Sequence, residues 1–218
     1  PLLLGSCAPD SVLGFSGPLR RMDEIGVEPG PLRLQDAVLG SPVVRGAARP
    51  MRFAEHWRIP VTDGPDRDQF GSSAERLHEG RFVISTTSNH VGPRLRPDAS
   101  ASLPARERTD EVLSRGVPIG AVEVPAGDEL LVLHRGRGVT AGYPVLAVGT
   151  ATGLSRLGQA RPGHSVEFVR VTLAEAVAAA RAERALIDGV SSRMTRLLSA
   201  QTSYRPGDES PATHRVAS

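Results

Sequence analysis

A glycine- and arginine-rich segment is the part of this sequence whose residue types best suit ligand binding. Residues 134–144 read HRGRGVTAGYP and contain three glycines, two arginines and two hydroxyl side chains. Glycine allows a backbone to approach a ligand closely, and the guanidinium groups of Arg135 and Arg137 offer paired donors to a carboxylate or phosphate. Thr140 and Tyr143 supply the hydroxyl groups. The segment therefore predicts either an anion-binding loop or a hairpin connection whose arginines are solvated.

Glu123 is an acidic residue inside an otherwise apolar run, GAVEVP at 120–125. A carboxyl group buried in such a run has a raised pKa and can give or take a proton, or bind a cation. Successive side chains of a strand point to opposite faces, so the same residue would also suit the solvent face of a strand. The residues alone leave both interpretations open.

A third segment, SNHVGPR at 88–94, contains Asn89, the only asparagine of the chain, next to His90. An imidazole titrates near neutral pH, so His90 could transfer protons. A polar turn between two strands would use the same residue types. The six histidines show no HxE or HExxH spacing and the chain has one cysteine, so we expect no metal site.

The basic residues exclude several kinds of protein. All 26 are arginine, and the absence of lysine excludes a Walker-A phosphate loop, Schiff-base chemistry and covalently attached biotin on this chain. The net charge is only +2 and the arginines are spread without aromatic partners, which argues against nucleic-acid binding. No apolar run reaches the roughly 18 residues of a membrane span. The single cysteine favours a reducing, cytoplasmic setting.

Short apolar runs separated by turn residues predict a mainly β protein. The chain contains 23 glycines and 18 prolines in 218 residues, which favours many turns. Strands are expected from Arg58 to a break at Asp63-Gly64-Pro65, and within 81–86, 91–96, 121–124, 129–134, 143–148 and 165–171. A short helix is expected over 72–79 and a loop over 97–111. A closed barrel and a sandwich both fit this pattern.

One longer helix is expected to begin at Thr172. The sequence TLAE at 172–175 forms a capping box, and apolar residues then recur at helical spacing. Gly189 is the predicted end of this helix. The polar residues beyond it predict a disordered tail at 191–218.

Four segments in chain order resemble signatures of the biotin-dependent carboxyltransferase-like family, which includes one of the subunits of bacterial 5-oxoprolinase and proteins called allophanate hydrolase subunit 2. SRGVPIGAVEVP at 114–125 resembles the family's SEGxxxGAIQVP, and GRGVTAGYP at 136–144 resembles DRQTTGGYP. SNHVGPRL at 88–95 is similar to SNRMGYRL, and LGQARPG at 157–163 is similar to LxQxRPG. The matches correspond to the later part of the family's usual chain.

The resemblance implies a mainly β fold, a cyclophilin-like β-barrel with a few short helices. The barrel is expected at residues 58–190, with inter-subdomain strands and a linker at 1–57 and the tail at 191–218. The family also implies a related barrel subunit as a partner and, in some complexes, a lactam-handling subunit. Such a complex is expected to use ATP, bound at the level of the complex, to convert a small-molecule substrate, 5-oxoproline, to glutamate.

The same motifs supply the expected site residues. The expected catalytic residues are Glu123, Tyr143 and Thr140. The expected substrate- or anion-binding residues are Arg137, Gly138, Gly142, Asn89 and Arg94.

Several motif positions differ from the family pattern, among them His90 in place of an arginine and Pro93 in place of a tyrosine. Arg115 replaces a glutamate, Glu123 a glutamine and Gly136 an aspartate. The leading hypothesis is a subunit of an ATP-dependent amide- or lactam-cleaving complex. The differences also suit a non-catalytic regulatory module that binds a related barrel subunit. A third hypothesis is a carboxyltransferase domain that acts on carboxybiotin supplied by another chain.

Overall fold

A computed structural model describes residues 21–22, 24, 54–108 and 111–203 of the chain. Contacts divide the chain into two units, Pro1–Ser41 and Pro42–Ser218, and all features below belong to the second unit. Of the segment predicted as strands and linker at 1–57, residues 1–20, 23 and 25–53 lie outside the described residues, as does the part of the predicted tail at 204–218.

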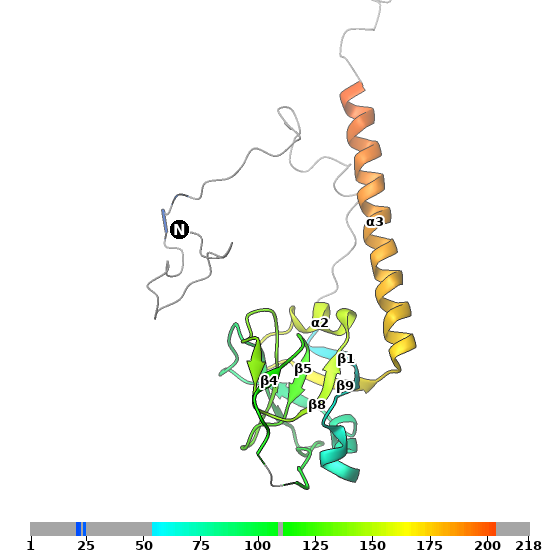
Figure 1. The fold of residues 1–218 in the computed structure, drawn as a ribbon. Coiled ribbons are helices and arrows are strands. Elements are labelled where there is room, and N and C mark those ends of the chain that lie inside the picture. Colours follow the sequence, from blue (N-terminus) through cyan, green and yellow to red (C-terminus); the bar gives the residue numbers. More distant parts are fainter. Residues whose placement is uncertain (1–20, 23, 25–53, 109–110, 204–218) are drawn as a thin grey trace, which may run out of the picture. The chain divides into compact units, whose positions relative to one another are not determined.

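Seven strands form a closed barrel in the order β1-β8-β5-β6-β3-β2-β9 (Figure 1). The barrel strands are β1 (His56–Asp63), β2 (Phe82–Ile84), β3 (Arg94–Pro97), β5 (Ala121–Glu123), β6 (Leu130–Val132), β8 (Val145–Gly149) and β9 (Ser165–Arg170). Two further strands, β4 (Arg115–Gly116) and β7 (Thr140–Ala141), pair with each other. The helices of the described residues are the 3-10 helix η1 (Arg67–His78), α2 (Ala151–Leu157) and α3 (Leu173–Ser203).

Strand β1 closes the barrel because it pairs on both sides. It runs antiparallel to β8, with Val61 opposite Gly149, and parallel to β9 from His56 opposite Ser165 to Val61 opposite Arg170. A closed sheet leaves no free edge for pairing with another chain. The predicted mainly β fold with a cyclophilin-like barrel is confirmed, and the sandwich alternative is excluded.

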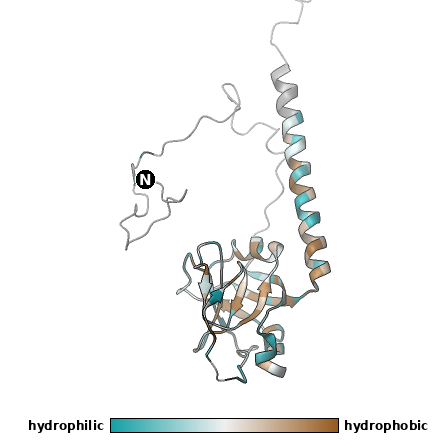
Figure 2. Ribbon diagram, viewed as in Figure 1, coloured by the Kyte–Doolittle hydropathy of each residue, from teal (hydrophilic) through white to brown (hydrophobic). Residues whose placement is uncertain are grey.

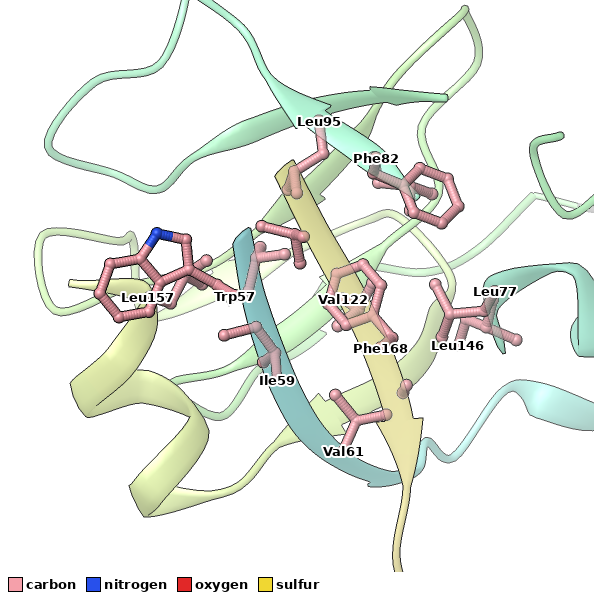
Figure 3. Close-up of a cluster of buried hydrophobic side chains, with 14 of the residues drawn as sticks. Trp57, Ile59, Val61, Leu77, Phe82, Leu95, Val122, Leu146, Leu157 and Phe168 are labelled. Carbon is pink, nitrogen blue, oxygen red and sulfur yellow. The ribbon is translucent and has the colours of Figure 1, made fainter. Parts of the chain in front are cut away.

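The barrel interior is filled by side chains that alternate along the strands. Trp57, Ile59 and Val61 of β1 are buried while the residues between them are more exposed, as period-2 alternation requires. Phe168 of β9 meets Phe82 edge to face at a ring-centroid distance of 5.8 Å (Figure 3). The predicted alternation of these strands is therefore confirmed.

A second apolar cluster covers the other face of β5, β6 and β8, and it decides where Glu123 lies. Its buried members are Val117, Ala121, Leu131, Leu133 and Val145. All three residues of β5 and of β6 are buried, so these strands do not alternate between core and solvent. Figure 2 shows the corresponding hydrophobic colour along the barrel strands and hydrophilic colour in many of the loops. A strand covered on both faces has no solvent side.

The helices differ from the prediction in three ways. Helix η1 begins at Arg67 rather than near 72, and α2 was not predicted. The prediction that Gly189 ends the last helix is wrong, because α3 continues through it to Ser203. Residues 191–203, expected in the disordered tail, are therefore helical. A single glycine costs a helix only about 1 kcal/mol, and the alanine, arginine and leucine residues around it favour a helix.

The capping box at the start of α3 is confirmed. Thr172 Oγ1 accepts a hydrogen bond from the backbone N–H of Glu175 at 3.2 Å, and the Glu175 carboxylate accepts one from the backbone N–H of Thr172 at 2.8 Å. The hydrogen bonds that the Glu175 carboxylate accepts from the backbone N–H and the hydroxyl of Thr172 hold the pKa of Glu175 below its usual value. No helix within the described residues has an apolar stretch long enough to cross a membrane.

Thr172→Ala is expected to lower the free energy of unfolding by about 1 kcal/mol, because it removes the side-chain acceptor of the helix start. Chemical denaturation followed by the fluorescence of Trp57 measures the change. Thr172→Ser keeps the hydroxyl group and is the matched control. Equal stability of the alanine and serine variants would contradict the role of the cap.

Candidate active site

Two of the segments singled out in the sequence lie against each other. The backbone N–H of His134 donates to the carbonyl oxygen of Val91 at 2.7 Å. A Cβ atom on Gly136 would lie 2.3 Å from the carbonyl oxygen of His90, far inside van der Waals contact. Only glycine therefore fits at position 136, where the family motif has aspartate, and the loop at 88–92 packs on the glycine-rich loop.

The glycine-rich loop also contacts the segment that leads into β5. Arg137 donates from Nε to the carbonyl oxygen of Val117 at 3.2 Å. The backbone N–H of Val117 donates to the carbonyl oxygen of Val139 at 3.1 Å, and β4 pairs with β7. The three segments of the sequence analysis therefore lie together on one side of the barrel.

A cavity of about 420 Å³ lies where two of these segments end. One wall is the turn after β5 and another is the stretch before β8, and the backbone N–H of Val124 donates to the carbonyl oxygen of Pro144 at 3.2 Å across them. The cavity is lined by Leu103, Pro104, Arg106, Val112, Val124, Pro125, Ala126, Gly127, Gly142, Tyr143 and Pro144. Its volume lies in the range of about 300–1,000 Å³ typical of small-molecule sites.

Glu123 directly precedes this wall and is buried. Its exposed fraction is 1%, and its Oε1 atom has no hydrogen-bond partner among the residues that the structure describes. Burial raises the pKa of Glu123 to about 7. A carboxyl group with a pKa near neutrality is suited to proton transfer. Glu123 itself is not among the lining residues.

Asp66 is a buried neighbour of the site that the sequence patterns did not indicate. Its exposed fraction is 4%, and it accepts hydrogen bonds from the backbone N–H of Val145 at 2.7 Å and from Gln69 Nε2 at 3.0 Å. It also forms an ion pair with Arg115, at the position where the family motif has glutamate. Asp66 follows the turn Asp63-Gly64-Pro65, and no sequence signal distinguishes it from the exposed acidic residues nearby.

The predicted site residues of the glycine-rich segment divide into two groups. Gly142 and Tyr143 line the cavity, and the exposed fraction of Tyr143 is 48%. Thr140 and Gly138 are exposed and do not line it.

Two of the predicted binding residues have partners within the chain. Arg94 forms an ion pair with Glu129 at 2.6 Å. Asn89 Oδ1 accepts a hydrogen bond from the backbone N–H of Val91 at 3.0 Å, an Asx turn that shapes its own loop. These contacts give both residues structural roles outside the cavity lining.

The described residues of the site do not form a binding site for a metal ion, and the cavity lining does not suit a nucleotide. No group of three or more His, Cys, Asp or Glu side chains within the described residues is placed to hold a metal ion. The described lining of the cavity carries a single charged side chain, Arg106. A triphosphate needs several cationic or backbone donors, so the cavity does not fit ATP.

The architecture defines a class: a closed β-barrel with a loop-built cavity on its outer side. Residues 1–170 match the family model described as carboxyltransferase domain, subdomain A and B. The chain belongs to this family, as the sequence motifs predicted.

One curated relative and two solved structures give the scale of the similarity. The chain is 26% identical over 197 residues to the 5-oxoprolinase C subunit of Escherichia coli (strain K12), and the match covers 89% of the chain and 60% of that relative. The urea amidolyase of K. lactis is 20% identical, with a TM-score of 0.56 over 68% of this chain and 9% of that one. The urea carboxylase of Kluyveromyces lactis is 21% identical, with a TM-score of 0.55 over 66% of this chain and 13% of that one. These two structures support the fold.

Proposed function

We propose that the chain is a subunit of an ATP-dependent complex that opens the lactam 5-oxoproline to glutamate. The observation that carries the proposal is the cavity between two family motifs, with Val124 and Pro125 on one wall and Gly142, Tyr143 and Pro144 on another. The similarity to a 5-oxoprolinase subunit supports the choice of reaction.

Opening a lactam requires water and a proton. The ring C–N bond breaks, the hydroxyl of water ends on the carbonyl carbon, and the ring nitrogen takes up a proton. Glu123, with its pKa raised to about 7 by burial, populates both protonation states at neutral pH and is the proposed proton carrier. Tyr143 lines the cavity with a half-exposed phenol and is the proposed hydrogen-bond partner of the substrate.

ATP and further subunits belong to the complex in this proposal. The cavity beside Tyr143 carries too few cationic groups for a triphosphate, and in this proposal ATP is bound at the level of the complex. The partners are a related barrel subunit and a lactam-handling subunit, as the family resemblance implies. Arg137, on the loop that packs beside the cavity-forming segments, is a proposed contact for an anionic group at their junction.

Purified complex with its partner subunits should form glutamate from 5-oxoproline in the presence of ATP. Tyr143→Phe removes a hydroxyl at the cavity and should lower kcat/KM about 10-fold or more, the effect of about 1.4 kcal/mol of lost substrate hydrogen bonding. Tyr143 is half-exposed, so the variant should keep the stability of the wild type.

The matched control for this assay is Thr86→Val, a change at an exposed hydroxyl that does not line the cavity. A folded and complete complex without glutamate formation would refute the proposal. Intact partner binding with no bound 5-oxoproline would favour the non-catalytic regulatory module instead.

A further inference from the structure

We propose that two copies of this chain associate through helix α3, with the two helices antiparallel and Glu183 of each copy against Arg193 of the other. α3 is one unbroken helix of 31 residues (Figure 1). The inference does not rest on the proposed function, because no residue of α3 lines the cavity beside Tyr143.

Helix α3 has an apolar face that nothing in the described chain covers. None of its described side chains, at 173–196, is buried. The exposed fractions of Leu186 and Ile187 are 55% and 56%. A helix in a folded protein gains most of its stability from the packing of an apolar face. The uncovered face of α3 therefore suits a further packing partner.

This face follows the spacing of a coiled coil. Positions 176, 179, 183, 186, 190, 193 and 197 are separated alternately by three and four residues, as are the contact positions of a heptad repeat. In order, they carry Ala, Ala, Glu, Leu, Val, Arg and Leu. Two contact positions therefore carry opposite charges, whereas the others are apolar.

The two charges favour an antiparallel pair of identical helices. In a parallel pair each residue lies beside its own copy, so Glu183 would meet glutamate and Arg193 would meet arginine. In an antiparallel pair, the register that sets Leu186 against Val190 also sets Glu183 against Arg193. Two-fold symmetry forms this ion pair twice. A polar residue at a contact position can fix the register of a coiled coil.

Both charges are available for such a pair. Glu183 and Arg193 form no hydrogen bond or ion pair within the residues that the structure describes. Arg184, by contrast, pairs along the helix with Asp188, with 3.1 Å between Nε and Oδ1. Glu183 and Arg193 are about 15 Å apart along the helix axis, so they cannot pair with each other within one copy.

A groove beside α3 leaves room for a second helix. The groove has a volume of about 860 Å³ and is lined by residues of α3, α2 and β1. Four of the heptad positions, Ala176, Ala179, Glu183 and Leu186, belong to its α3 wall. The small alanine side chains let another helix approach closely. In the antiparallel register, the later part of the second copy's α3 lies against this wall.

Sedimentation velocity of the full chain tests the inference. The wild type should show a monomer–dimer equilibrium between about 1 and about 100 µM, the range of a modest interface. Glu183→Arg and Arg193→Glu each bring like charges together and should weaken dimerisation at least about 10-fold. The double variant, Glu183→Arg with Arg193→Glu, restores opposite charges and should dimerise like the wild type.

Arg181→Glu is the matched control. It makes the same charge change as Arg193→Glu, but position 181 is nine residues, or about two and a half turns, before Val190 and so lies on the opposite side of the helix. This variant should dimerise like the wild type. Far-UV circular dichroism checks that each variant keeps its helix content.

Three results would overturn the inference. The first is a wild type that stays monomeric over this range, whether or not it binds a related barrel subunit through α3. The second is a dimer that neither single charge change weakens. The third is a double variant that dimerises no better than the single variants, because the antiparallel register requires the restored pair. None of these measurements depends on glutamate formation, so the inference and the proposed function can fail separately.

Discussion

Glu123→Gln is expected to raise the free energy of unfolding by about 3 kcal/mol at pH 8 and to leave it nearly unchanged at pH 4. Burial raises the pKa of Glu123 from 4.5 to about 7, and each pKa unit corresponds to about 1.4 kcal/mol. The folded state therefore holds this proton more tightly than the unfolded state does. The unfolding free energy of the wild type should fall as the pH rises from about 4.5 to about 7, and then level off.

Urea denaturation between pH 4 and pH 8 measures this effect, with Trp57 as the reporter because it is the only tryptophan and is buried. Glutamine carries no charge at any of these pH values, so the variant should lack this part of the pH dependence. Glu79→Gln changes an exposed glutamate and is the matched control. A constant difference between Glu123→Gln and wild type across this range would show that Glu123 titrates normally.

The same substitution, Glu123→Gln, should raise stability but lower activity. Glutamine stands at this position in the family motif, so the variant should fold well. It cannot carry a proton, however, and a loss of lactam opening in the more stable variant would show that the buried acid is retained for chemistry. Residues needed for activity commonly lower the stability of the folded protein in this way.

The strands of the barrel could be predicted because their signals are local. Apolar runs such as 165–171 and turn residues such as Gly163, with a φ of +88°, mark where a strand begins or ends. Barrel closure depends on the parallel pairing of β1 with β9, residues more than 100 positions apart, for which a single sequence carries no signal. At Gly189 a local signal was misleading, because the surrounding helix-forming residues carry α3 through this glycine.

The site could be predicted only where it coincides with a motif. Gly142 and Tyr143 were found because they lie in a family signature. Glu123 was ambiguous, since its burial depends on a second apolar cluster formed by segments distant in sequence, including Val117 and Leu133. Arg106 and Asp66 belong to a loop and a turn of ordinary composition. What brings both to the site is their packing around η1, which no pattern of spacing shows.

Asp66→Ala is expected to lower the free energy of unfolding by about 3 kcal/mol, whereas Arg115→Ala should cost less than about 1 kcal/mol. The two residues form one ion pair, but their surroundings differ. The exposed fraction of the Arg115 side chain is 41% and that of Asp66 is 4%. An arginine at the surface returns to water at little cost.

The larger cost of losing Asp66 comes from its neutral donors. Its removal leaves the buried backbone N–H of Val145 and the amide of Gln69 without their acceptor. A buried donor left unpaired costs about 1–3 kcal/mol, in addition to the bonds lost. Asp66→Asn retains one acceptor oxygen and should lie between the wild type and Asp66→Ala.

Denaturation of Asp66→Ala, Arg115→Ala and the double variant separates the contributions. If the buried hydrogen bonds dominate, the double variant should be about as unstable as Asp66→Ala, and the coupling between the two residues should be small. Equal losses for the two single variants would instead assign the stability to the ion pair. Because Asp66 holds Val145, which follows the cavity wall formed by Tyr143 and Pro144, Asp66→Ala should also weaken the binding of 5-oxoproline, while Arg115→Ala should not.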